Sequence, residues 1–169
     1  MKILFGSRLD GCPPPRDWTG LRHMVTGPSG LLTALEQNLG LPPANQTSLQ
    51  RILAYRDALE SAKSGTFFAE SLELDPLSVA RTLLNWRDEL KLAGWNPNPQ
   101  NPGRLADLAK VEATFNDTAG EAQRLTNART ALESGRKAGI EALKCVSPVT
   151  TLPKLWRDLL NLLPTSVSN

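Results

Sequence analysis

Apolar residues in this chain fall into two patterns, short segments bounded by turn residues and longer stripes with helical spacing. The short segments are residues 2–5, 22–26 and 140–146, and a turn or a proline follows each of them. Runs of this length bounded by turn residues are typical of buried strands. The first helical stripe follows the second run, ends at Gly40, and consists of Leu31, Leu32, Leu35 and Leu39.

The clearest helix signal begins at Asp75 and ends near Gly94. Asp75 is a natural N-cap, Pro76 fits the first helical position, and a glycine suits the C-terminal side. The apolar stripe of this segment is wide, which predicts burial on more than one side. We therefore expect Trp86 to be a core residue, together with Trp95 and Trp156.

Other helices are predicted from caps and apolar spacing. Thr47 and Gln50 fit a capping box at the start of a helix that Gly65 ends. A proline-rich linker, Asn96–Pro102, interrupts the helical region. The remaining predicted helices are 104–115, 120–133 and 152–163, and the chain closes on a polar end, Thr165–Asn169.

This order of elements predicts a helix-rich α/β protein with a small, mostly parallel sheet and helices on its faces. Residues 1–46 and 134–169 would form the sheet-containing core, and residues 47–133 would form a helical insertion between strands. An all-α fold remains the alternative if the three strands prove short or irregular.

Composition narrows the function classes. A net charge of +2 is too small to indicate nucleic-acid binding without a local basic patch. Two cysteines and one histidine cannot supply the roughly four soft ligands of a structural zinc site. No signal peptide or membrane-spanning segment is recognisable, so we expect a cytoplasmic protein without membrane contact.

The turn Gly27-Pro28-Ser29-Gly30 lies between a strand and a helix, where a phosphate loop would lie. Backbone N–H groups at a helix N-terminus attract anions. A working phosphate loop also needs GxxxxGK[ST], and here Leu31 and Leu32 follow instead of a lysine. A tight turn that begins a helix is the more common outcome, so we predict a degenerate phosphate-loop position without a nucleotide cofactor.

No set of residues predicts catalysis or a metal site. Asp88 and Glu89 are adjacent on a helix and point about 100° apart, so they cannot readily share one site. Ser7, Ser29 and His23 lack the G-x-S-x-G turn of a nucleophilic serine. Cys145 lies in an apolar run, where we expect it to be buried and inert.

Three basic side chains on the predicted helix at 75–94 are candidate contacts for DNA phosphates. They are Arg81, Arg87 and Lys91. The more ordinary interpretation is that they form the solvated side of that helix. Aromatic residues are too few to predict a surface that stacks the bases of a single strand.

Three stretches resemble a known family. They are Val25–Leu41, Asp75–Trp95 with its run Arg87-Asp88-Glu89-Leu90-Lys91-Leu92-Ala93-Gly94-Trp95, and Leu152–Leu160. Together they resemble the N-terminal region of large bacterial PD-(D/E)XK nucleases related to the AddB and RecB exonuclease subunits. The resemblance covers nearly the whole chain, although no single stretch is a defining motif.

The resemblance implies a helicase-like domain of the RecA type with a helical insertion and degenerate helicase motifs. Nuclease carboxylates of that family lie far downstream, so no catalytic residue carries over to this stretch. We therefore expect a non-catalytic module of a DNA repair or recombination exonuclease, either a truncated chain or a fragment. Its expected partners are DNA and a helicase subunit. Two other functions stay open, a small helical protein–protein adaptor and an independent binder of nucleotides or small anions at Gly27–Gly30.

Overall fold

Each of the three predicted strands forms, and a fourth strand joins them. The computed structural model describes the chain except for residues 17, 19, 99, 101–102, 147 and 168–169. The strands β1 (Lys2–Phe5), β2 (His23–Thr26), β3 (Ala142–Cys145) and β4 (Thr165–Val167) lie in the order β2-β1-β3-β4. Every pair is parallel, which confirms the predicted α/β class with a small parallel sheet.

The sequence-based interpretation missed β4. Residues Thr165–Val167 were expected to belong to a polar end, but they pair with Leu143–Cys145 at the edge of the sheet. An edge strand has only one neighbour, and this one has exposed polar residues at Thr165 and Ser166. A strand of this kind lacks the apolar run on which the prediction depended.

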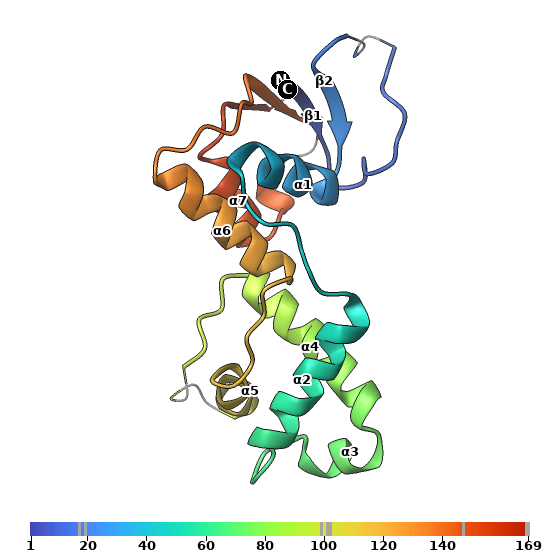
Figure 1. The fold of residues 1–169 in the computed structure, drawn as a ribbon, viewed down its shortest axis with the longest axis vertical. Helices are drawn as coiled ribbons and strands as arrows, with labels where there is room; N and C mark the ends of the chain where they lie inside the picture. The colour runs from blue at the N-terminus through green and yellow to red at the C-terminus, as the bar shows by residue number, and fades with distance from the viewer. Residues whose placement is uncertain (17, 19, 99, 101–102, 147, 168–169) are drawn as a thin grey trace. The chain divides into compact units, whose positions relative to one another are not determined.

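Contacts divide the chain into two compact units, and each is described by itself. Unit 1 comprises residues 1–43 and 124–169, and unit 2 comprises residues 44–123 (Figure 1). The boundaries predicted from sequence lie at 46/47 and 133/134, so they assign most of α6 (Glu121–Glu133) to the other unit. Arg124 explains the difference, because it forms two hydrogen bonds of 2.7 Å with Glu36 of unit 1.

One face of the sheet packs on helices. Ile3, Phe5, Leu143 and Cys145 point to this face and are buried. The ring of Phe5 stacks on Trp156 of α7 (Lys154–Leu160) with 5.9 Å between centroids. Helix α1 (Pro28–Leu39) follows β2 directly and ends at Gly40, whose positive φ of 65° suits a glycine. A short 3₁₀ turn, η1 (Val149–Thr151), precedes α7.

Unit 2 is helical, with its core between three long helices and one short one. They are α2 (Ser48–Ala62), α3 (Ala69–Leu74), α4 (Pro76–Leu92) and α5 (Arg104–Glu112). The predicted capping box at Thr47 and the predicted Asp75 cap both form. The linker after α4 includes Pro99, Asn101 and Pro102, which lie outside the described residues. Buried side chains of the core are Tyr55, Leu59, Phe68, Leu72, Leu83, Leu84, Leu108 and Val111.

The expectation that Trp86 is a core residue is wrong. Its side chain is 44% exposed, whereas Trp156 is 2% exposed as expected. Among the helices that the structure describes, none combines the length and apolar character needed to cross a bilayer.

Candidate functional site: the start of helix α1

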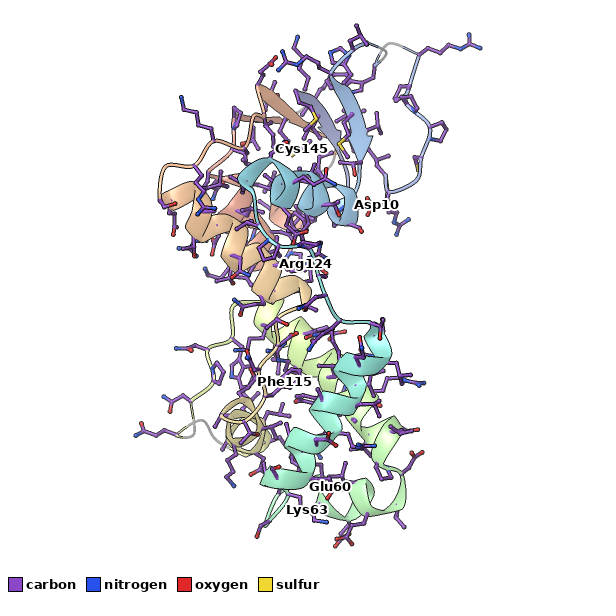
Figure 2. The ribbon with its side chains drawn as sticks, in the orientation of Figure 1. Asp10, Glu60, Lys63, Phe115, Arg124 and Cys145 are labelled. Carbon is purple, nitrogen blue, oxygen red and sulfur yellow. The ribbon has the colours of Figure 1, made fainter. Side chains whose placement is uncertain are left out.

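Asp10, a residue of the β1–β2 connection, occupies the start of helix α1. Its carboxylate accepts hydrogen bonds from the backbone N–H groups of Gly27 (2.9 Å), Ser29 (2.9 Å) and Gly30 (3.0 Å). Figure 2 shows Asp10 beside the first turn of the helix. Free N–H groups at a helix N-terminus bind anions. Here the bound anion is a carboxylate of the same chain.

The two glycines of the turn leave room for this carboxylate. A Cβ atom at Gly27 would lie 2.6 Å from the Asp10 carboxyl carbon. A Cβ atom at Gly30 would lie 2.0 Å from Thr26 Oγ1 and 3.3 Å from Asp10 Oδ1. Close approach of another group to the backbone is one of the reasons for glycine at such positions. Gly27 and Gly30, which suggested a phosphate loop, therefore have a structural role that does not require a phosphate: they let the Asp10 carboxylate approach the backbone.

Electrostatics favour the ionised form of Asp10. Partial burial acts to raise the pKa of the carboxyl group, but hydrogen bonds from Gly30, Ser29 and Gly27, with one from Thr26, outweigh it. The pKa therefore lies below its ordinary value of 3.8. A carboxylate in this position repels a second anion, and the turn supplies no lysine to offset that repulsion.

The candidate phosphate contacts on α4 differ in their surroundings. Arg81 is exposed, and it forms no ion pair among the described residues. Arg87 is 5% exposed, and its guanidinium donates to Glu112, Asp88 and Asp117. Lys91 pairs with Glu112 at 3.1 Å and lies over the ring of Trp95. The structure does not bring the three cations together on one exposed surface.

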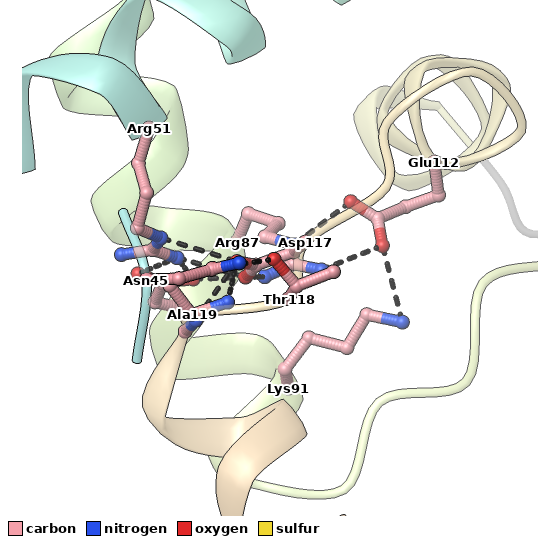
Figure 3. A network of polar contacts seen from close by, with 10 residues as sticks. Asn45, Arg51, Arg87, Lys91, Glu112, Asp117, Thr118 and Ala119 are labelled. Atoms are coloured by element: carbon pink, nitrogen blue, oxygen red, sulfur yellow. Dashed lines mark hydrogen bonds and ion pairs between the residues drawn. The ribbon is translucent and has the colours of Figure 1, made fainter. Parts of the chain in front are cut away.

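Arg87 belongs to a network of ion pairs inside unit 2 (Figure 3). Its second cation is Arg51, which donates to Asp117 (2.8 Å) and to Asp88 (3.0 Å). Asp117 also accepts from the N–H of Gly120 at 2.8 Å. Burial disfavours the charged carboxyl, yet Arg51, Arg87 and Gly120 hold the pKa of Asp117 below its ordinary value. The network joins α2, α4, α5 and the segment before α6, which is a structural role.

Candidate catalytic groups are not assembled in the described part of the chain. No cluster of three or more His, Cys, Asp or Glu side chains that could hold a metal ion occurs there. His23 stacks on Trp18 at 5.2 Å, and its buried Nδ1 has no hydrogen-bond partner among the residues that the structure describes. Cys145 is buried as predicted, and burial raises the pKa of its thiol.

Sequence reasoning missed Asp10, Glu36 and Asp117, which are the acids that organise the polar contacts. Asp10 lies 17 residues before Gly27, the first residue whose backbone N–H group donates to it. Asp117 lies 66 residues after Arg51. Caps and apolar spacing relate only residues that are close in sequence, so they could not reveal these contacts. The one hint of the Asp10 contact was a glycine-containing turn at the start of a helix, together with an acid in the preceding loop.

No family model, no curated protein and no solved structure matches the chain.

Proposed function

We propose that this chain is a non-catalytic, helicase-like module of a DNA repair or recombination exonuclease, where it acts as a scaffold and contacts DNA phosphates. The observation that supports it most is the Asp10 carboxylate at the start of α1. In a helicase-like fold a nucleotide phosphate would bind there. Here the Asp10 carboxylate occupies the phosphate position. This is what we expect of a domain that keeps the helicase-like fold but does not hydrolyse ATP.

Further support comes from the parallel sheet with a helical unit between β2 and β3, and from the resemblance of 25–41, 75–95 and 152–160 to the nuclease family. The family's catalytic carboxylates have no counterpart in these stretches. We therefore propose that nuclease activity, where it exists, belongs to other parts of the protein and that this chain supplies binding and architecture.

Nucleotide binding is the first test. We expect millimolar ATP with magnesium to leave the melting temperature of the chain unchanged, because Asp10 already fills the anion position. Nuclease and ATPase assays on the same sample should give no turnover. A clear rise in melting temperature with ATP, or magnesium-dependent cleavage of linear DNA, would contradict the proposal.

DNA binding is the second test. Affinity for a short random-sequence duplex should be measurable at low salt and should weaken as salt rises, because phosphate contacts release counterions. Absence of binding at every salt concentration would remove DNA contact from the proposed function.

One surface favours a second candidate, the protein–protein adaptor. Phe67 and Trp86 are partly exposed, and both line two apolar pockets of about 230 and 440 Å³ in unit 2. Exposed aromatics beside apolar pockets are common at protein interfaces. Self-association in sedimentation that Trp86→Ala abolishes, with no salt-dependent DNA affinity, would favour the adaptor over the DNA module.

A further inference from the structure

The order of the strands determines where their connections lie. From β1 to β2 the chain moves in one direction across the sheet, and from β2 to β3 and β3 to β4 it moves in the other. Because such connections are right-handed, the helices after β2 and β3 lie on one face and the β1–β2 connection belongs to the opposite face. That connection, residues 6–22, holds three consecutive prolines and no helix among its described residues.

Within the described residues, the sheet consequently has one face without a helix over it. Paired residues of a parallel sheet point the same way, so Lys2, His23 and Ala142 share this face, as do Leu4, Val25, Lys144 and Ser166. Lys2, Lys144 and Ser166 are exposed, and of this set only Leu4 is buried. We call these seven residues the open face. Trp18 of the connection stacks on His23, so the β2 side is partly covered.

An open face is unusual in an all-parallel sheet, whose strands normally have both faces buried. An apolar open face would suggest a covering helix from another polypeptide. This one instead presents two lysines on neighbouring strands and no acid. Neither lysine forms an ion pair within the part of the chain that the structure describes.

Positive charge continues at the amino ends of the strands. The lining of a pocket of about 560 Å³ there includes Arg22, Arg136 and Lys137 together with apolar residues such as Leu132 and Leu163. Its acid, Glu141, is already paired with Arg22 (3.1 Å) and with the amino group of Met1 (3.0 Å). The described residues of the open face and of this pocket therefore carry more basic than acidic side chains.

We propose that the open face of the sheet binds the phosphate backbone of DNA, through Lys2 and Lys144, with Lys137 at its amino end. This inference rests on the proposed function, from which it takes DNA as the ligand, and what it adds is the location of the binding site. It moves the contact surface from α4, where Arg87 and Lys91 are engaged by acids, to the sheet of unit 1. Phosphate contacts of this kind position a duplex without reading its sequence.

The experiment compares two double variants with equal loss of charge. Lys2→Gln with Lys144→Gln removes the charges of the open face. Lys63→Gln with Lys110→Gln removes two solvent-accessible charges from unit 2, where each lysine pairs with an acid of its own unit. Affinity for a random-sequence duplex is measured by fluorescence anisotropy over a series of salt concentrations. All four substitutions are at surface positions, and circular dichroism checks that each variant is folded.

Loss of two phosphate contacts should reduce the slope of log affinity against log salt by about 1.8. Between 50 and 200 mM salt the wild type should then lose about tenfold more affinity than the open-face variant. The unit 2 variant should keep the wild-type slope. As a second readout, DNA should protect Lys2 and Lys144 from acetylation while Lys63 stays reactive.

The outcomes separate the two proposals. Wild-type binding with equal slopes for both variants, and no protection of Lys2 or Lys144, overturns the open-face site but leaves DNA binding intact. No DNA binding by the wild type overturns both. A dimer that disappears in the open-face variant, without a change in DNA affinity, overturns the site in favour of a protein occupant.

Discussion

Asp10 and Asp117 are both bound by several donors, but each unit stabilises its acid differently. In unit 1, Asp10 is near the surface and its three shortest hydrogen bonds come from backbone N–H groups of one helix terminus. In unit 2, Asp117 has a side chain 1% exposed and receives two guanidinium groups as well as Gly120 N–H. Helix-terminal dipoles stabilise the first acid and full charges stabilise the second.

This difference predicts that the stability of unit 2 depends more on the Asp117 carboxylate than the stability of unit 1 depends on the Asp10 carboxylate. Water can partly replace the lost interactions of an exposed acid. A buried cation that loses its partner cannot be hydrated, which raises the free energy of the folded state considerably. Replacing each acid therefore tests whether the contrast between the two sites is energetic as well as geometric.

The largest effect should come from Asp117→Asn. Arg87 and Arg51 would lose a shared buried partner, which we expect to destabilise unit 2 by about 3 kcal/mol. Urea unfolding combined with amide hydrogen exchange assigns the loss to one unit. Asp57→Asn is the matched control, because the Asp57 side chain is 68% exposed. If the two variants lose similar stability, the buried network does not act as described.

A smaller effect is expected for Asp10→Ala. Loss of the capping carboxylate should cost about 1 kcal/mol in unit 1, within the range for N-cap removal. Asp10→Asn keeps an acceptor oxygen and should lose less. In Asp10→Ala the freed N–H groups of Ser29 and Gly30 should also bind inorganic sulfate, which would raise the melting temperature of this variant only. Equal sulfate stabilisation of the wild type would show that Asp10 does not fill the anion position.

Acid should affect both sites in the same direction. The folded-state pKa values of Asp10 and Asp117 lie below 3.8, so the unfolded chain takes up these protons first. Their stabilisation is complete above the unfolded pKa and is lost as pH falls through the folded values. Unfolding free energies measured from about pH 6 to about pH 3 should fall less steeply in Asp117→Asn than in the wild type. Parallel curves would contradict the lowered pKa of Asp117.

Signals that depend on neighbouring residues were readable from the sequence. Thr47 with Gln50, and Asp75 with Pro76, placed the starts of α2 and α4, because caps form within one turn. The runs at 2–5, 22–26 and 140–146 placed three strands. Strand order was not readable, since β1 pairs with β3 across more than 130 residues.

Trp86 and Arg87 show where amphipathic reasoning fails. Side-chain type predicts a buried tryptophan and a solvated arginine, and the structure reverses both. Arg87 shares its face with Leu83 and Leu84, and Glu112, Asp88 and Asp117 compensate its charge. Because Glu112 and Asp117 come from other segments of the chain, the periodicity of α4 alone could not place the arginine inside.

The separation of β1 from β3 also affects the order of folding. β1 lies between β2 and β3, so the centre of the sheet cannot be completed until residues beyond 142 have left the ribosome. Unit 2 is continuous from 44 to 123 and its contacts are more local. Long-range pairing is slow compared with local helix packing. During synthesis, unit 2 is therefore expected to be native while β1 still lacks β3, its neighbour on the side away from β2.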